Sequence, residues 1–321
     1  MGRPSRHAGA GDRAMSADAP DGPLPAGLRR RRALVAGVVL AIAWPFVLAG
    51  PAAWRTASQV LALVLVGLSL TVTVGWLRVM ALFAPAAAVA GAGATVVLIG
   101  GGRPGLGLAA ALVAGAAAGL LALAPASANP RRWLPVTSLV LTVAGVLVMP
   151  RLFRPVTPSG LFGLDLTDDR VVYLVGLAVV IAACAGVARL RLRTPGRHLA
   201  GIGADDGTEE PQRWWVAGVA LSGSLAGAAG YLTALLHHGV PSPMEFSPTT
   251  AVAYLAIPFV GGASTVGGAV VGAVVFLTAA RTSLALGLAS VTLPAVLLVV
   301  AAAVRHDGLV AWVRVRAGHR R

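Results

Sequence analysis

The side chains able to do acid–base chemistry lie outside the apolar segments of this chain. All twelve carboxylates, among them Asp165, Asp169 and Asp307, fall in polar stretches. Transporters coupled to protons or sodium commonly hold ionisable groups at membrane depth, because an ion in a low dielectric needs a counter-charge. The pattern therefore argues against ion coupling through carboxylates and against hydrolysis by paired acids. Sodium sites built from carbonyl and hydroxyl oxygens stay open.

The sequence also gives no support for a catalytic nucleophile or a metal site. Cys184 stands alone in an apolar run, and the six histidines show no metal-ligand spacing. No G-x-S-x-G or H-E-x-x-H motif occurs. The chain also lacks lysine, so it has no G-x-x-x-x-G-K-[ST] phosphate loop, and another chain would have to hydrolyse any ATP. We expect no catalytic residue, no metal and no cofactor.

Hydroxyl groups are the main polar side chains left inside the apolar segments. Bonds to their own helix or to a neighbouring helix are the simpler interpretation, and lining a translocation path is the alternative. The hydroxyl residues are Ser69, Thr71, Thr73, Thr95, Ser138, Thr142, Ser222, Ser224, Thr233 and Thr265.

The elements that must position these groups are membrane helices. The chain is 57% hydrophobic and 12% charged, with a mean hydropathy of +0.80, which is typical of a polytopic membrane protein. A span needs about 20 apolar residues. On that basis we expect an all-α protein with about ten spans, the short eighth and ninth of which could instead form one broken helix. The expected spans are 33–50, 58–77, 79–100, 105–125, 134–150, 171–188, 214–236, 249–263, 266–280 and 283–304.

The net charge of +14 comes entirely from arginine. The heavier arginine clusters lie at span ends and in the tails, where the positive-inside bias explains them without a nucleic-acid partner. Ten spans place both termini and the loop 189–213 in the cytoplasm. We therefore expect a disordered basic tail over 1–32, a membrane domain over 33–304 and a basic tail over 305–321.

Four motifs follow one another in the second half of the chain. An arginine-rich exit from a span, RLRLRTPGR, precedes S-G-x-x-A-G-x-x-G from Ser222 to Gly230. An external segment PSPMEFSP comes next, and then G-G-x-x-T-x-x-G-x-x-x-G-A from Gly261 to Ala273. Glycines at this spacing allow close helix packing but are weak evidence alone. Their order resembles the permease subunits of branched-chain amino acid ABC importers, of the LivM and LivH types.

The resemblance implies a type II ABC-importer permease-like bundle in the bacterial plasma membrane. It implies a second permease subunit, identical or different, two cytoplasmic ATPase subunits and an extracytoplasmic substrate-binding protein. The cargo would be a branched-chain or other small amino acid, or a related amide. The implied residues are Arg197, Asp205, Asp206, Glu209 and Glu210 for ATPase coupling; Ser222, Gly223, Gly227, Gly230, Gly261, Gly262, Thr265, Gly268 and Gly272 for packing or translocation; and Glu245 and Phe246 in the external loop.

The coupling loop departs from the family pattern. It is shorter by about five residues, and Gly207 and Pro211 disfavour a long helix, so we expect at most a short one over 197–206. Plain solvation is the alternative explanation for the charges of this loop. At the level of function, the alternatives are an ATP-independent transporter or channel and a membrane scaffold that transports nothing.

Overall fold

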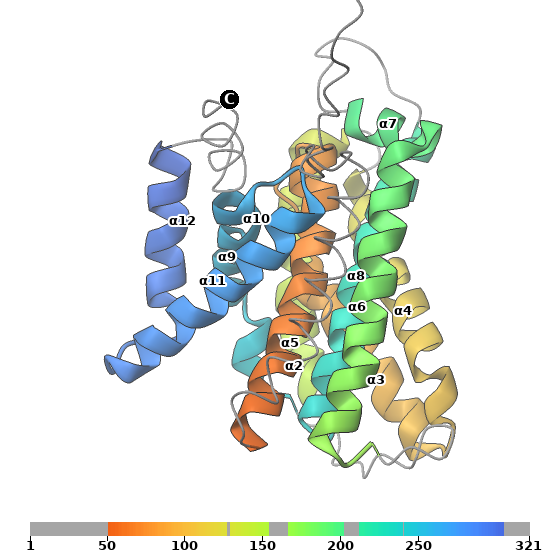
Figure 1. Cartoon of the computed structure of the whole chain (residues 1–321). Coiled ribbons are helices and arrows are strands. Elements are labelled where there is room, and N and C mark those ends of the chain that lie inside the picture. Colours follow the sequence, from red (N-terminus) through yellow and green to blue (C-terminus); the bar gives the residue numbers. More distant parts are fainter. Residues whose placement is uncertain (1–50, 127–128, 154–165, 202–211, 240, 305–321) are drawn as a thin grey trace, which may run out of the picture. The chain divides into compact units, whose positions relative to one another are not determined.

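Helices make up all the regular structure in the described residues of the computed structural model, which are 51–126, 129–153, 166–201, 212–239 and 241–304. They belong to one unit, Gly50–Arg321 (Figure 1). Within the described residues, 6 helical stretches are long and apolar enough to cross a membrane. The candidate spans are Ala52–Trp76, Gly107–Ala126, Pro130–Arg151, Asp169–Leu192, Gln212–Leu236 and Val266–Ala285.

The described helices come in the following order along the chain. Helix α2 (Pro51–Leu70) runs directly into a π-helix, η1 (Thr71–Trp76). The other helices are α3 (Ala84–Gly100), α4 (Gly107–Leu123), α5 (Pro130–Leu152), α6 (Asp169–Leu192), α7 (Thr194–Gly201), α8 (Gln212–Leu236), α9 (Pro248–Tyr254), α10 (Ala256–Gly261), α11 (Val266–Ala285) and α12 (Thr292–Val304). Three 3-10 turns, η2 (Pro104–Leu106), η3 (Ala124–Ala126) and η4 (Pro243–Phe246), complete the described elements.

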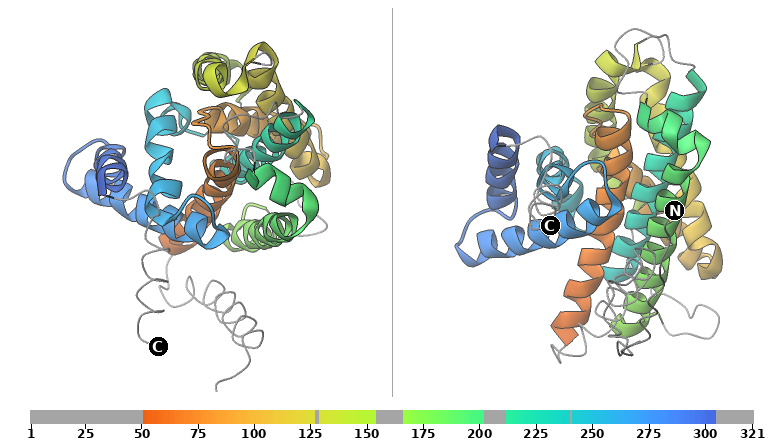
Figure 2. Two further views of the ribbon diagram at one scale, coloured as in Figure 1. Left: turned by 90° about the horizontal axis from the view of Figure 1, so that it is seen from above. Right: turned by 45° about the horizontal axis from the view of Figure 1, so that its top comes forward.

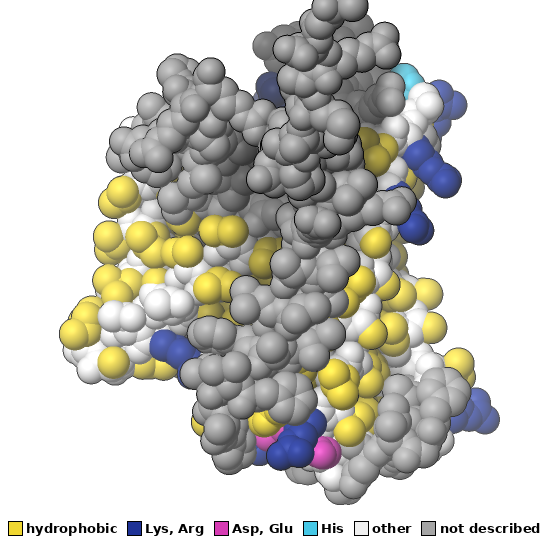
Figure 3. All heavy atoms as spheres, in the orientation of Figure 1, with side chains coloured by type: hydrophobic (Ala, Val, Ile, Leu, Met, Phe, Trp, Pro, Cys, Tyr) yellow, Lys and Arg dark blue, Asp and Glu magenta, His cyan; other side chains and the backbone are white. Residues whose placement is uncertain are grey.

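Helices α2 and α8 form the core of the bundle. Within their most apolar windows 83% and 72% of the residues are buried, against 22% for α5 and 33% for α4 and α6. Seen along the bundle in Figure 2, α2 lies among the other helices, and α3, α4 and α6 lie around α8. The outer helices show hydrophobic side chains on their open faces, as Figure 3 illustrates. This is the arrangement expected where lipid is the solvent.

The two ends of the bundle carry different elements (Figure 1). One end, which we call the α7 end, holds α7, the last turn of α6 and the first turn of α8. Helices α2 and α6 begin at the opposite end. Described arginines at the α7 end are Arg78, Arg131, Arg132, Arg189, Arg191, Arg193, Arg197 and Arg213, and those at the opposite end are Arg55, Arg103, Arg151, Arg170 and Arg281.

The chain leaves helical structure between η1 and α3, over residues 77–83. Irregular backbone inside a bilayer needs partners from the protein, because lipid offers none. Helix α5 supplies a hydrogen-bond partner for both backbone groups of Leu82. The Leu82 N–H donates to Ser138 Oγ at 2.9 Å, and the Leu82 carbonyl oxygen accepts from Thr142 Oγ1 at 2.6 Å. Ser138 and Thr142 lie about 12 to 18 Å along α5 from its first residue. The segment therefore descends into the bundle before α3 begins.

Helices α9 to α12 pack beside this core. Leu255 separates α9 from α10, and a turn at 262–265 leads into α11. Gly287, with φ of +72°, ends α11 with a bond from Leu288 N to Ser283 O of 2.9 Å. This is the Schellman arrangement, in which a left-handed residue stops a helix. Helix α12 then starts only at Thr292.

The structure changes three of the ten expected spans. The third begins at Ala84 instead of 79 because residues 77–83 are irregular, and the tenth begins at Thr292 instead of 283 because Gly287 turns the chain. The eighth is itself a short broken helix over α9 and α10, whereas the ninth is a separate long helix, α11, so the two do not form the one broken helix that the sequence left open. These three, Ala84–Gly100, Pro248–Gly261 and Thr292–Ala303, are too short to be counted with the six. The expected span 33–50 and both tails, 1–32 and 305–321, lie outside the described residues.

Candidate functional site

The S-G-x-x-A-G-x-x-G motif lies on the buried face of α8. Gly223, Gly227 and Gly230 are all buried, and a Cβ on any of them would collide with a backbone carbonyl oxygen of α3 or α4. Those oxygens belong to Gly115, Ala111 and Ala88 in turn. The three glycines therefore let α8 contact two helices backbone to backbone, as small residues do between membrane helices. We call this contact the α8 seam.

Ser222 adds a polar bond on the side of α8 that faces α2. Its Oγ lies 2.8 Å from Ser69 Oγ and 3.0 Å from the Ser69 carbonyl oxygen. If Ser222 donates to the carbonyl, Ser69 donates to Ser222, and both buried hydroxyl protons are used. The interhelical bond anticipated for hydroxyls in spans is thus present at this pair.

The remaining hydroxyls mostly bond within their own helices. Thr71, Thr95 and Thr233 donate to carbonyls four residues earlier, at 2.8, 2.8 and 2.9 Å. This agrees with the simpler of the two interpretations. Ser138 and Thr142 are the exceptions, since they hold Leu82 in the irregular segment. Their importance was not visible in the sequence, because nothing in an apolar run marks where a helix is interrupted.

The G-G-x-x-T-x-x-G motif forms the α10–α11 turn. Gly262 takes a φ of +110°, which favours glycine, and Thr265 Oγ1 caps α11 by accepting from Gly268 N at 3.0 Å. A Cβ on Gly261 would collide with the Gly268 carbonyl oxygen, and one on Gly272 with that of Ile257. All five residues thus shape one tight hairpin of α10 and α11.

The α10–α11 turn lies against two other elements at the α7 end. The Ala263 carbonyl oxygen occupies the space where Gly75 of η1 would carry a Cβ. Arg191, in the last turn of α6, donates from Nη1 to the Ser264 carbonyl oxygen. The motif residues of the turn are therefore joined to the element that precedes α7.

Helix α7 is the described part of the expected coupling loop. It spans Thr194–Gly201, three residues earlier than the expected start at 197, and Arg197 belongs to it. His198 stacks on Trp214 of α8 with ring centroids 5.4 Å apart and planes inclined by 19°. Leu199 is 2% exposed. The other expected coupling residues, Asp205, Asp206, Glu209 and Glu210, lie outside the described residues.

The external-loop residues have two different environments. Phe246 is 4% exposed and packs with residues of α3 and α5, so its side chain is part of the core and is covered from outside contact. Glu245 is half-buried and its Oε1 lies 3.2 Å from Nε2 of His237, just after α8. The hydrogen bond that His237 donates to Glu245 raises the pKa of His237, although burial and Arg55 oppose the rise.

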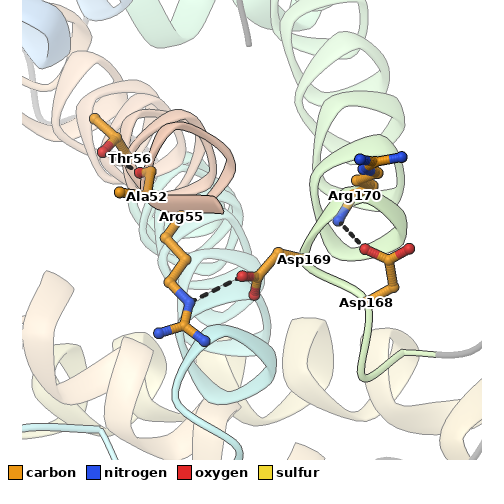
Figure 4. Close-up of polar contacts among 6 residues, drawn as sticks. All are labelled: Ala52, Arg55, Thr56, Asp168, Asp169 and Arg170. Atoms are coloured by element: carbon orange, nitrogen blue, oxygen red, sulfur yellow. Dashed lines mark hydrogen bonds and ion pairs between the residues drawn. The ribbon is translucent and has the colours of Figure 1, made fainter. Parts of the chain in front are cut away.

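A second ion pair joins α2 to α6 at the same end. Arg55 Nε lies 2.9 Å from Asp169 Oδ2, and Asp168 caps α6 by accepting from Arg170 N at 2.9 Å, as Figure 4 shows. Arg170 lies over the ring of Trp54, 5.8 Å from its centroid. Among the described residues, no three His, Cys, Asp or Glu side chains gather as metal ligands would.

Comparison with known proteins gives no relative. No protein-family model, curated protein or solved structure matches this chain. Its function must therefore be argued from the residues and their geometry.

Proposed function

We propose that this chain is the permease subunit of an ABC importer, related to those for branched-chain amino acids. It would form a path for a small amino acid or a related amide, and separate ATPase subunits would supply the energy. One observation carries the proposal. Motifs resembling those of the family, at 222–230 and 261–273, coincide with close backbone contacts of α8 with α3 and α4 and of α10 with α11, and a short helix occurs in the segment that would dock an ATPase.

The orientation follows from charge. The α7 end has eight described arginines and no described carboxylate, whereas the opposite end has five described arginines with Asp168, Asp169 and Glu245. Arginine excess favours the cytoplasm. We therefore place α7 in the cytoplasm of a bacterial cell and η4 outside it. With the six candidate spans, the three shorter helices and the segment 33–50, the proposed fold is a type II importer bundle.

The proposed mechanism needs no covalent chemistry from this chain. ATP binding and hydrolysis in the partners would press on α7 and shift the bundle between inward-open and outward-open states. The absence of lysine excludes a phosphate loop here, and the described spans hold no carboxylate between their terminal turns. Energy would therefore enter through the partners and not through an intramembrane ion pair. A second permease subunit and a binding protein complete the proposed assembly.

The test is purification of the tagged full chain from its native membranes in mild detergent, followed by mass spectrometry. We expect an ABC ATPase and a second permease subunit, or a second copy of this chain. Replacing 203–212 by a Gly/Ser linker separates docking through the polar loop from docking through α7. If the wild-type chain brings down no ATPase, the proposal is wrong and an ATP-independent transporter or a scaffold becomes the better account.

A further inference from the structure

We propose that the π-helix η1 transmits movement of α7 to the α10–α11 turn, through Leu199, Leu77 and Gly75. The proposal rests on the proposed function in one respect, since a docked ATPase is what would move α7. The contacts that carry it are independent of any partner.

The first contact joins α7 to the residue that follows η1. A Cβ placed on Gly218 of α8 would lie 3.0 Å from Leu77 Cδ1 and 3.3 Å from Leu199 Cδ2. The two leucine side chains therefore pack against the same glycine of α8, and both are almost completely buried. We expect a shift of α7 that moves Leu199 to disturb the packing of Leu77 on this glycine, because dense packing resists a void.

The second contact joins η1 to the turn. Gly75 lies two residues before Leu77, and its missing side chain leaves room for the Ala263 carbonyl oxygen. Movement at Leu77 therefore reaches the turn through three consecutive residues of one backbone. The turn also positions Thr265, the N-cap of α11, and Gly268 in the first turn of that helix.

The hydrogen bonds of η1 and of the residues that follow it are wider than those of an α-helix. Leu77 N donates to Val72 O at 3.0 Å, five residues back, and Val79 N donates to Thr73 O at 3.0 Å, six back. π-helical segments are rare and occur frequently at functional sites. Trp76 Nε1 is buried without a partner, and Arg78 takes a φ of +52°. Both features cost free energy, so this conformation is held by its surroundings.

A second contact joins α6 to the α10–α11 turn. Arg191 of α6 donates to the Ser264 carbonyl oxygen, and α7 follows α6 after a single residue, Arg193. The turn is thus held from one side by α6 and from the other by η1. A movement of α7 acts on both, and a change from π to α bonding in η1 would alter its rotation per residue and so turn Gly75 relative to the α10–α11 turn.

The direct test is hydrogen–deuterium exchange on the full chain in lipid nanodiscs. In Leu199→Ala, we expect at least severalfold faster exchange at Gly262 and Gly268, whose amide N–H groups at the two ends of the turn donate to the carbonyl oxygens of Pro258 and Thr265. Leu123→Ala is the matched control, since Leu123 of α4 is 3% exposed and Leu199 is 2% exposed. Leu199→Met, which keeps a long apolar side chain, should restore slow exchange. Unchanged exchange at the turn in Leu199→Ala would overturn the proposal.

A second variant acts on the turn without altering α7. Gly75→Ala places a methyl group against the Ala263 carbonyl oxygen, so the turn should exchange severalfold faster while α7 exchanges as in the wild type. In the purified complex, Leu199→Ala should retain the ATPase but lose stimulation of ATP hydrolysis by substrate. Absence of an ATPase from the wild-type complex would refute the proposed function alone. Retained stimulation in Leu199→Ala, or an undisturbed turn in Gly75→Ala, would refute the transmission.

Discussion

At the scale of single residues, the α8 seam depends on glycines, because any residue with a Cβ would collide with the backbone of α3 or α4. Gly227→Ala would press a methyl group on the Ala111 carbonyl oxygen, and overpacking of this kind typically costs about 1–3 kcal/mol. We expect a lower melting temperature in detergent. Gly186→Ala is the matched control, since no atom lies within 4 Å of the position its Cβ would take. Equal stability of the two variants would contradict the close contact.

The pair of His237 and Glu245 makes the connection after α8 sensitive to pH. The pKa of His237 is raised above its ordinary value of 6.5, chiefly by its hydrogen bond to Glu245. The stabilisation is therefore complete below about pH 6.5, and is lost as the pH rises through the raised pKa. Asp169, paired with Arg55, and Arg55 itself are the nearby charges on α2 and α6.

His237→Gln should remove this dependence. Measured from pH 6 to pH 8, the melting temperature of the wild type should fall as the pH rises through the raised pKa of His237, and that of the variant should change less. His238→Asn serves as the control, because His238 is exposed, has a φ of +47° and asparagine tolerates that conformation. A wild type whose stability is flat over this range would show that the pair contributes nothing.

At the scale of elements, the irregular segment 77–83 depends on two hydroxyls of α5. Ser138→Ala leaves the Leu82 N–H without its acceptor, and Thr142→Val leaves the carbonyl without its donor. A buried polar group left unpaired costs about 1–3 kcal/mol. We expect each variant to unfold at a lower temperature and to exchange the Leu82 amide faster.

Thr278→Val is the control for these hydroxyl variants. Thr278 is exposed on α11 and donates only to Val274 O, at 2.8 Å, within its own helix. Its loss should change stability by a few tenths of a kcal/mol. If all three variants behave alike, the hydroxyls of α5 do not support the segment.

Sequence patterns predicted some of these elements and not others. The six long helices follow from runs of about 20 apolar residues, and the close packing at Gly227 and Gly272 follows from small residues at four-residue spacing. The interruption at 77–83 and the late start of α12 did not follow. Residues 79–83 and 283–291 are as apolar as a helix interior, and hydropathy reports composition but not hydrogen bonding. The burial of Phe246 was likewise hidden, since it depends on α3 and α5 and not on its neighbours in sequence.

At the scale of the whole molecule, the orientation can be measured directly. In a Cys184→Ala background, Ser242→Cys lies next to η4 and Thr194→Cys begins α7; both positions are exposed. A membrane-impermeant maleimide added to intact cells should label Ser242→Cys and should reach Thr194→Cys only after permeabilisation. The reverse pattern would place α7 outside the cell and would exclude docking of a cytoplasmic ATPase there.

In the proposed function, the chain carries cargo at the expense of ATP hydrolysed by another protein. The most direct measurement is ATP hydrolysis by the purified complex in lipid, with and without a binding protein loaded with a small amino acid. We predict hydrolysis that rises severalfold with the loaded binding protein and loses that rise when Leu199 is truncated to alanine. Transport of the amino acid across the membrane by this chain without any ATPase present would contradict the proposed function.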